Sequence, residues 1–282
     1  MIMPSSCREV FDDMTLKNSC NASQLSSYFL KESASPNERR KLFYAMQYAA
    51  EHAYDLYKSA FTKRQAELSH AIPKVYMTEG RLIAGLGARN ILEAGLTMNR
   101  LYGVPMISGS SLKGITAHYC SCILGDVDEN YRGYDLDAKS KPRQQAGNIY
   151  AALFGRLDDD GKSEEGGFLR FYDAWIVPPE NDIALGDTFV MDVMTPHHME
   201  YYSEKDGYDS PTCFDAPIPV SFLAVKGAFE VRIGCDERAE PDAEKRAGWV
   251  EFAHKILEQA LRDMGIGSKT RGGYGRMRLR KV

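Results

Sequence analysis

The 282-residue sequence contains no long hydrophobic run, and this absence sets the first limit on the class of protein. No apolar stretch approaches the roughly 20 residues that a membrane-spanning helix requires. The first residues also lack a basic start followed by an apolar stretch, which would mark a secretory signal. We therefore expect a cytoplasmic protein that has no membrane partner. Apolar residues make up 44% of the chain and charged residues 26%, as in folded globular proteins.

Cysteine pairs and metal-binding spacings are missing as well. The six cysteines form no Cys-x-x-Cys pair and no regular framework, which predicts reduced thiols. The adjacent His197 and His198 point to opposite sides of an extended chain and have no third ligand nearby, so they do not predict a zinc site. The acidic residues around 158–165 lack the oxygen-ligand spacing of a calcium loop and indicate a solvated turn. We expect neither a metal nor another cofactor.

Excess positive charge is also scarce. The net charge is −4 and the isoelectric point is about 5.9, which is unusual for a free-standing nucleic-acid-binding protein. Residues 264–282 differ from this average, because they contain six basic residues and no acidic one, leaving −10 on the rest of the chain. A basic tail on an acidic body indicates a local site for a polyanion, with other faces available to protein partners.

Hydrophobic periodicity predicts an α+β fold, because helices and strands are mixed without regular βαβ alternation. A capping box at 35–38 starts a long amphipathic helix over 36–68, so residues 1–70 are expected to form an arm and a helical extension. Further helices are predicted at 109–124, 146–154 and 242–264. Strands are predicted at 75–84, 168–177, 188–195 and 275–281, with a hairpin of 219–225 and 228–233 that turns at Lys226-Gly227. Polar loops are expected at 125–145 and 203–216, and a turn at 158–166.

The segment 265–275 has the richest chemistry, with five glycines among eleven residues. Glycines allow positive φ angles and let backbone N–H groups approach a phosphate. Lys269 and Arg271 add positive charge, Thr270 adds a hydroxyl and Tyr274 offers a stacking face. A nucleotide-binding P-loop is not predicted, because Ser268 precedes the lysine and the order is helix, loop, strand. A helix C-cap followed by a tight turn would need fewer glycines. The candidate binding residues are Gly267, Lys269, Thr270, Arg271, Gly272, Gly273, Tyr274 and Gly275.

Two further segments are candidates for binding. In the predicted helix start 109–114, Ser110 and Ser111 can cap the helix and leave N–H groups free for an anion, beside Lys113 and Gly114. A plain N-cap explains these residues equally well. In the second segment, His197 and His198 lie near Tyr201, and we favour binding or structural use of this cluster. One of the two histidines could instead act as a general base.

Taken together, these segments resemble the RAMP superfamily of CRISPR proteins, whose hallmark is a late glycine-rich loop like 265–275. Within the superfamily, the chain is similar to the sixth subunits of Cmr-type (type III-B) effector complexes. The supporting motifs are Thr195-Pro196-His197-His198 with Tyr201-Tyr202, then 217–223, and Phe154-Gly155 leading into 167–174. The resemblance covers about 80–280. Relatives often carry an arginine shortly after the Lys-Gly of the helix start, where this chain has Ala117 and His118.

The resemblance implies a ferredoxin-like, RRM-related core over 71–282, with insertions and the N-terminal helical extension. It implies a non-catalytic subunit that holds guide RNA toward its 3′ end, while another subunit cuts the target. The implied partners are guide RNA and other subunits of the complex, with target RNA as a further candidate. Backbone cradling of phosphates and aromatic stacking would make this binding largely independent of sequence.

Two alternatives stay open at this stage. Some RAMP relatives cut precursor guide RNA without metal, and His197 or His198 beside Tyr201 could do so by acid–base catalysis. The net negative charge is also compatible with a protein-only scaffold in which the glycine-rich loop packs against a partner.

Overall fold

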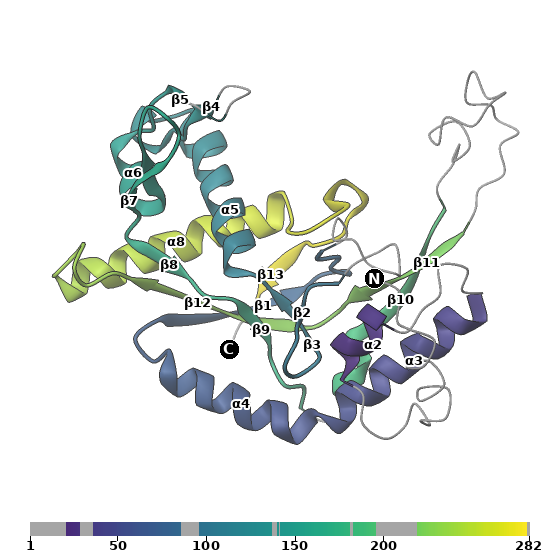
Figure 1. Ribbon diagram of the computed structural model, residues 1–282. Coiled ribbons are helices and arrows are strands. Elements are labelled where there is room, and N and C mark those ends of the chain that lie inside the picture. The colour runs from purple at the N-terminus through teal and green to yellow at the C-terminus, as the bar shows by residue number, and fades with distance from the viewer. Residues whose placement is uncertain are drawn as a thin grey trace, which may run out of the picture.

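The computed structural model describes residues 21–28, 36–85, 96–136, 140, 142–180, 183–195 and 219–280. Figure 1 shows a central sheet with helices α5 and α8 on one face and helix α4 on the other. The mixture of helices with antiparallel strands agrees with the predicted α+β class. Among the described helices, none is both long and apolar enough to cross a membrane.

The central sheet has seven strands, and every strand pairs antiparallel with its neighbours. Its order is β13-β1-β12-β9-β3-β2, with β8 also paired to β12. The strand predicted over 168–177 is interrupted at Tyr172 and Asp173, so it forms two short strands on the same neighbour. The bounds are β1 Ile72–Thr78, β2 Met98–Asn99, β3 Val104–Ile107, β8 Leu169–Phe171, β9 Ala174–Ile176, β12 Ala228–Cys235 and β13 Met277–Leu279.

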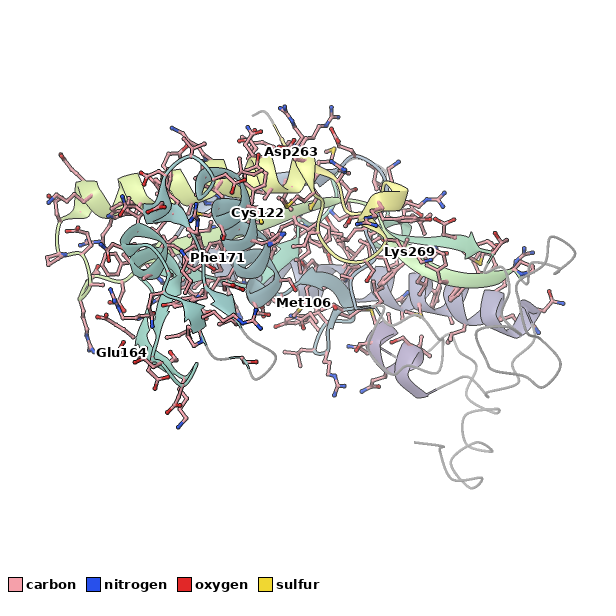
Figure 2. All side chains as sticks on the ribbon, turned by 90° about the horizontal axis from the view of Figure 1, so that it is seen from above. Met106, Cys122, Glu164, Phe171, Asp263 and Lys269 are labelled. Carbon is pink, nitrogen blue, oxygen red and sulfur yellow. The ribbon has the colours of Figure 1, made fainter. Side chains whose placement is uncertain are left out.

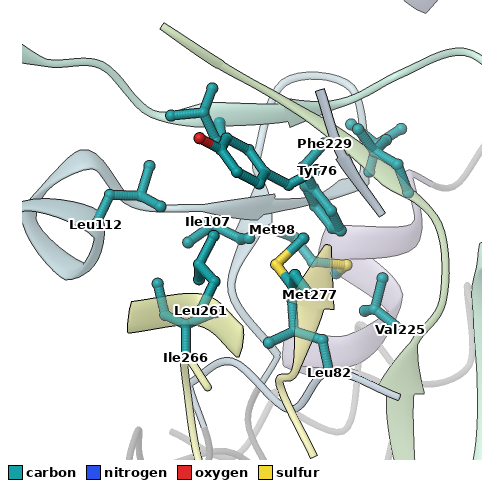
Figure 3. Packing of buried hydrophobic residues seen from close by; sticks show 14 of the residues in the cluster. Tyr76, Leu82, Met98, Ile107, Leu112, Val225, Phe229, Leu261, Ile266 and Met277 are labelled. Atoms are coloured by element: carbon teal, nitrogen blue, oxygen red, sulfur yellow. The ribbon is translucent and has the colours of Figure 1, made fainter. Parts of the chain in front are cut away.

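Two of the described helices, α5 and α8, cover one face of this sheet, and both agree with the predicted helices. Helix α8 spans Ala243–Asp263, and the Asp242 carboxylate caps it by accepting the Glu244 N–H at 2.9 Å. Helix α5 spans Gly109–Tyr119 and continues as one π-helical turn, η1, over Cys120–Leu124. Figure 3 shows the core between these layers, where Leu112 and Leu261 approach strand residues such as Tyr76 and Met277.

The long helix predicted over 36–68 is two helices, so the prediction of one continuous helix was wrong. Helix α3 spans Pro36–His52, α4 spans Tyr54–Glu67, and a short helix α2 spans Ala22–Tyr28. At Ala53 the N–H is shared between the carbonyls of Ala49 and Ala50, both at 3.2 Å. Beyond the break, the Tyr57 hydroxyl donates to the Ile176 carbonyl at 2.5 Å, which holds α4 against the sheet. Ser35, the predicted cap, lies outside the described residues.

Strands β10 (Phe189–Met194) and β11 (Val220–Val225) form a second, two-stranded antiparallel sheet. A hairpin between β11 and β12 was predicted, and this prediction was wrong, because β11 pairs with β10 while β12 pairs with β1, β8 and β9. At the junction, the Lys226 N–H donates to the Thr188 carbonyl at 2.9 Å and the Gly227 N–H donates to Thr78 Oγ1 at 3.0 Å. Different neighbours therefore hold the two strands, and the chain passes between them without reversing (Figure 1).

The segment 125–166 is more ordered than the predicted loop and turn. It contains η2 (Glu129–Tyr131), the pair β4 (Asp135–Leu136) and β5 (Pro142–Gln144), helix α6 (Asn148–Phe154), and the pair β6 (Gly155–Leu157) and β7 (Ser163–Gly166). Helix α6 agrees with the prediction for 146–154. The loop predicted at 203–216 lies outside the described residues.

Two predicted strands near the glycine-rich segment are shorter than expected. The strand predicted over 75–84 begins at Ile72 and ends at Thr78, after which Leu82 forms an isolated bridge with Val225. The strand predicted over 275–281 is reduced to β13, because the residues before β13 make hydrogen bonds within the glycine-rich segment. Two single turns complete the described elements, η3 (Leu185–Thr188) and η4 (Thr270–Gly272).

Candidate functional site

The glycine-rich loop, residues 265–275, connects the end of α8 to β13. It begins as α8 ends, where the Gly265 N–H donates to the Ala260 carbonyl at 3.1 Å and Gly265 adopts a φ of +76°. The loop closes on itself through the Ile266 N–H, which donates to the Gly275 carbonyl at 2.9 Å. Both ends are thus fixed by backbone hydrogen bonds, as a helix C-terminus followed by a closed turn requires.

Two loop glycines are required by close backbone contacts. A Cβ at Gly267 would lie 2.2 Å from the Ile83 carbonyl oxygen, and one at Gly275 would lie 1.9 Å from the Ile266 carbonyl oxygen. Both residues also have positive φ, at +90° and +74°, which side-chain-bearing residues rarely adopt. Glycine at 267 and 275 therefore has a structural cause that is independent of any ligand.

The extended segment Arg81–Ile83 forms a seat for the loop. The Ser268 N–H donates to the Ile83 carbonyl at 2.8 Å, and the Gly275 N–H donates to the Arg81 carbonyl at 2.8 Å. Between them, Leu82 exchanges two backbone hydrogen bonds with Val225 of β11, each 2.8 Å long. The loop is thereby tied through its seat to the second sheet.

The positive side chains of the loop point outward. Lys269 and Arg271 are exposed, and neither forms an ion pair within the described part of the chain. Lys269 adopts a left-handed conformation with a φ of +56°, immediately before the η4 turn. Figure 2 shows Lys269 at the surface, well separated from Glu164 of the acidic β6–β7 pair. The loop thus presents two cations that are unpaired among the described residues, away from that acidic segment.

Tyr274 is half-buried. Its ring centroid lies 6.2 Å from that of Phe222, and its hydroxyl donates to Asp192 Oδ2 at 2.7 Å. The same carboxylate oxygen pairs with Arg81 Nη1 at 2.5 Å. Burial acts to raise the pKa of Asp192, but the hydrogen bonds from Arg81 and Tyr274 outweigh it and hold that pKa below its usual value. Asp192 is therefore an ionised anchor for two residues at the loop.

Arg81 and Asp192 were not predicted from the sequence as residues of this site. Asp192 lies on β10, about 80 residues before the loop, and Arg81 lies in a segment that was predicted to be ordinary strand. No local motif marks either residue, because their relation to the loop arises from the pairing of β10 with β11 and from the seat.

The start of α5 differs in detail from its prediction. The capping side chain is that of Ser108, which accepts the Ser111 N–H at 3.3 Å, so Ser110 and Ser111 lie within the first turn instead of capping it. The Asp173 carboxylate accepts the Gly109 N–H at 2.7 Å and thus occupies one of the donors that an anion could use. Ser110, Ser111 and Gly114 are exposed.

Lys113, on the same first turns of α5, is half-buried, and burial lowers its pKa. The neighbouring His118 is exposed and lies 3.7 Å from the Cys122 sulfur through Nδ1. The described residues contain no group of three or more metal-ligating side chains.

His197, His198 and Tyr201 lie outside the described residues. The strands that flank this segment are β10 and β11, of which β10 ends at Met194. Asp192, the anchor of Tyr274 and Arg81, is therefore on the strand that leads to the histidines.

A family model of the RAMP superfamily matches residues 76–278, a range that contains the glycine-rich loop, its seat and both helices of the covered sheet face. The chain belongs to the RAMP superfamily. This RAMP protein is 30% identical over 260 residues to the CRISPR system Cmr subunit Cmr6 of Pyrococcus furiosus, across 80% of this chain and 73% of that protein. The resemblance inferred from the motifs is thereby confirmed.

A solved structure of a type III-B complex supports the fold of this RAMP protein. A chain of the type III-B Cmr-beta complex bound to cognate target RNA matches with a TM-score of 0.55 and 19% identity, over 98% of this chain and 86% of that one. The crystal structure of Cmr6 from Pyrococcus furiosus is 27% identical over 75% of this chain and 98% of that chain, with a TM-score of 0.41. Only the first superposition is close enough to support the shared fold.

Proposed function

We propose that this RAMP protein is a non-catalytic, cytoplasmic RNA-binding subunit of a type III-B CRISPR effector complex. In this role it holds guide RNA toward its 3′ end through the glycine-rich loop. The observation that carries the proposal is the loop itself, which is fixed at both ends and exposes Lys269 and Arg271 without ion-pair partners in the described chain. The similarity to Cmr6 supports the choice of complex.

A ferredoxin-like core fits the proposal. The strand order β13-β1-β12-β9 places the first and third of the four core strands in the centre and the last at an edge. Helix α5 lies between β1 and β9 in the chain, α8 lies between β12 and β13, and the two helices pack together on one face. The glycine-rich loop then connects the second core helix to the last core strand.

The proposed contact is electrostatic and independent of base sequence. Phosphate oxygens would accept hydrogen bonds from Lys269, Arg271 and Thr270 at a turn whose backbone is already fixed, so little ordering cost remains for binding. A guide RNA with a variable spacer requires such sequence-independent contacts. The acidic remainder of the chain suits contacts with neighbouring protein subunits, and we propose that target RNA is held by those subunits.

The test is RNA binding by the double variant Lys269→Ala/Arg271→Ala across a salt series, alone and assembled with the other subunits. We expect an affinity loss on the order of tenfold or more and a salt slope that is shallower by about 2, since each lost phosphate contact lowers the slope by about 1. Arg156→Ala/Lys162→Ala, two exposed cations in and beside the β6–β7 pair, removes the same charge and serves as the control. Equal losses in both double variants, or none in either, would reject the loop as the RNA site.

A further inference from the structure

We infer that Asp192 is a positioning residue for RNA binding, which fixes Arg81 beside the glycine-rich loop so that Arg81 acts as a third phosphate-binding cation. This inference rests on the proposed function of the loop. The RNA site then includes a cation that lies outside the loop. It also includes an acidic residue that favours RNA binding, although its negative charge alone would oppose it.

The geometry of Arg81 supports this role. Its carbonyl accepts the Gly275 N–H at 2.8 Å, so its backbone is part of the loop's seat. Its side chain is 42% exposed, and its Nη1 pairs with Asp192 at 2.5 Å. A guanidinium has five N–H donors in a planar fork, so a single carboxylate oxygen leaves donors available for a phosphate. Arg81 is thus both anchored and accessible at the edge of the loop.

Asp192 coordinates two partners from one oxygen. Oδ2 accepts the Tyr274 hydroxyl at 2.7 Å and also pairs with Arg81. The Asp192 side chain is only 16% exposed, so it is largely withdrawn from a ligand at the loop surface. The carboxylate therefore orients a cation and an aromatic side chain of the site while it contributes little surface of its own.

A small buried cluster packs beside Arg81, Asp192 and Tyr274. Phe222, directly opposite Asp192 in the β10–β11 register, is fully buried together with Ile83 and Ala224, and Tyr274 packs against this small cluster. Asp192 therefore extends from a fixed strand, and the positions of Arg81 and Tyr274 follow from that strand.

The direction in which one substitution changes RNA affinity separates this role from general electrostatics. Removing a carboxylate near an RNA site normally strengthens binding, because repulsion of phosphates is removed. Asp192→Asn keeps the shape of the side chain and one acceptor oxygen. The neutral amide has no negative charge with which to hold Arg81 beside the Tyr274 hydroxyl, so Arg81 is released. We therefore expect Asp192→Asn to weaken RNA binding roughly threefold to tenfold. Arg81→Ala should weaken it similarly and lower the salt slope by about 1.

The experiment measures RNA affinity over a salt series for the wild type, Asp192→Asn, Arg81→Ala and the loop double variant, alone and assembled. Asp236→Asn is the matched control, because Asp236, which directly follows β12, pairs with Arg170 of β8. In Figure 1, β8 lies away from the glycine-rich loop. Thermal melting of each variant shows that it is folded.

Weaker binding by Asp192→Asn with unchanged or tighter binding by Asp236→Asn supports the inference. Unchanged or tighter binding by Asp192→Asn, while the loop double variant binds weakly, overturns the inference and leaves the proposed function intact. If Asp192→Asn binds weakly but Arg81→Ala binds like the wild type, Arg81 is not a phosphate contact and the inference fails. No RNA binding by the wild type in either form overturns the proposed function and the inference with it.

Discussion

At the scale of single residues, the loop glycines have different structural reasons to be glycine. Gly273 and Gly275 both adopt positive φ, at +88° and +74°. A Cβ at Gly273 would meet no atom within 4 Å, whereas one at Gly275 would collide with the Ile266 carbonyl. The sequence predicted a special loop from the number of glycines and from the polar and aromatic residues among them. The sequence could not distinguish glycines whose Cβ would collide with the backbone from glycines with open space at the Cβ position.

This difference gives a paired prediction for stability. Gly275→Ala should lower the free energy of unfolding by roughly 3 kcal/mol or more, because strain and a backbone collision combine. Gly273→Ala has the φ strain alone and should cost about 1 kcal/mol. Denaturant unfolding of both variants checks the prediction, and equal losses would show that the Gly275 contact relaxes without cost.

At the scale of elements, sequence patterns predicted the helices whose bounds depend mainly on residues close together in the chain. Helix α8, the start of α5 and the short helix α6 were all found within a few residues of their expected bounds. Pairing was less predictable. The Lys226-Gly227 step has the composition of a hairpin turn, but the partners of β11 and β12 are remote in sequence. The break at Ala53 likewise follows from tertiary contacts of α4, since no proline or glycine marks it.

The contact between α8 and β1 carries a pH prediction. His254 is fully buried, with Nε2 placed 3.1 Å from the Ile72 carbonyl and Nδ1 placed 3.2 Å from the Tyr76 hydroxyl. Burial lowers the pKa of His254 to about 4, although the hydrogen bond to Ile72 acts in the opposite direction. The unfolded chain takes up this proton near pH 6.5, so stability is full above that pH and declines as the pH falls toward 4.

Between pH 7 and pH 5 we expect this histidine to remove roughly 2 kcal/mol from the free energy of unfolding. A His254→Gln variant, which cannot titrate, should be less stable at pH 7 but should lose less on acidification. Urea unfolding at both pH values measures the difference. The same pH dependence in both proteins would assign the acid sensitivity to other groups.

At the scale of the whole molecule, a buried charge cluster joins the N-terminal helices to the sheet. The carboxylate of Glu230, on β12, accepts hydrogen bonds from Arg232 Nε at 2.7 Å and from Gln65 Nε2 at 2.6 Å. Its Oε1 lies 4.0 Å from Arg64 Nη1. Arg64 also lies over the Trp175 ring, 4.8 Å from its centroid. A single hydrophobic cluster includes residues of α3, α4 and the central sheet, so the helical extension shares its core with the sheet. Composition gave no sign of these buried charges.

Removing the central carboxylate tests this connection. Glu230→Gln leaves two buried arginines without a counter-ion and should cost roughly 3–5 kcal/mol of unfolding free energy. Glu251→Gln, which breaks the more exposed pair with Lys74, should cost about 1 kcal/mol or less. Chemical unfolding compares them, and similar small losses would mean that the cluster is dispensable for holding α4.

The unreversed passage from β11 into β12 has a mechanical consequence. β11 belongs to the two-stranded sheet that holds Asp192, and β12 is hydrogen-bonded on both sides within the central sheet. Tension applied to β11 along its axis would travel through the covalent backbone directly into the middle of the molecule. There it would load the hydrogen bonds of β12 together, in shear, instead of opening them one after another. The second sheet is thus joined through the backbone to β12, a strand that pairs with β1, β8 and β9.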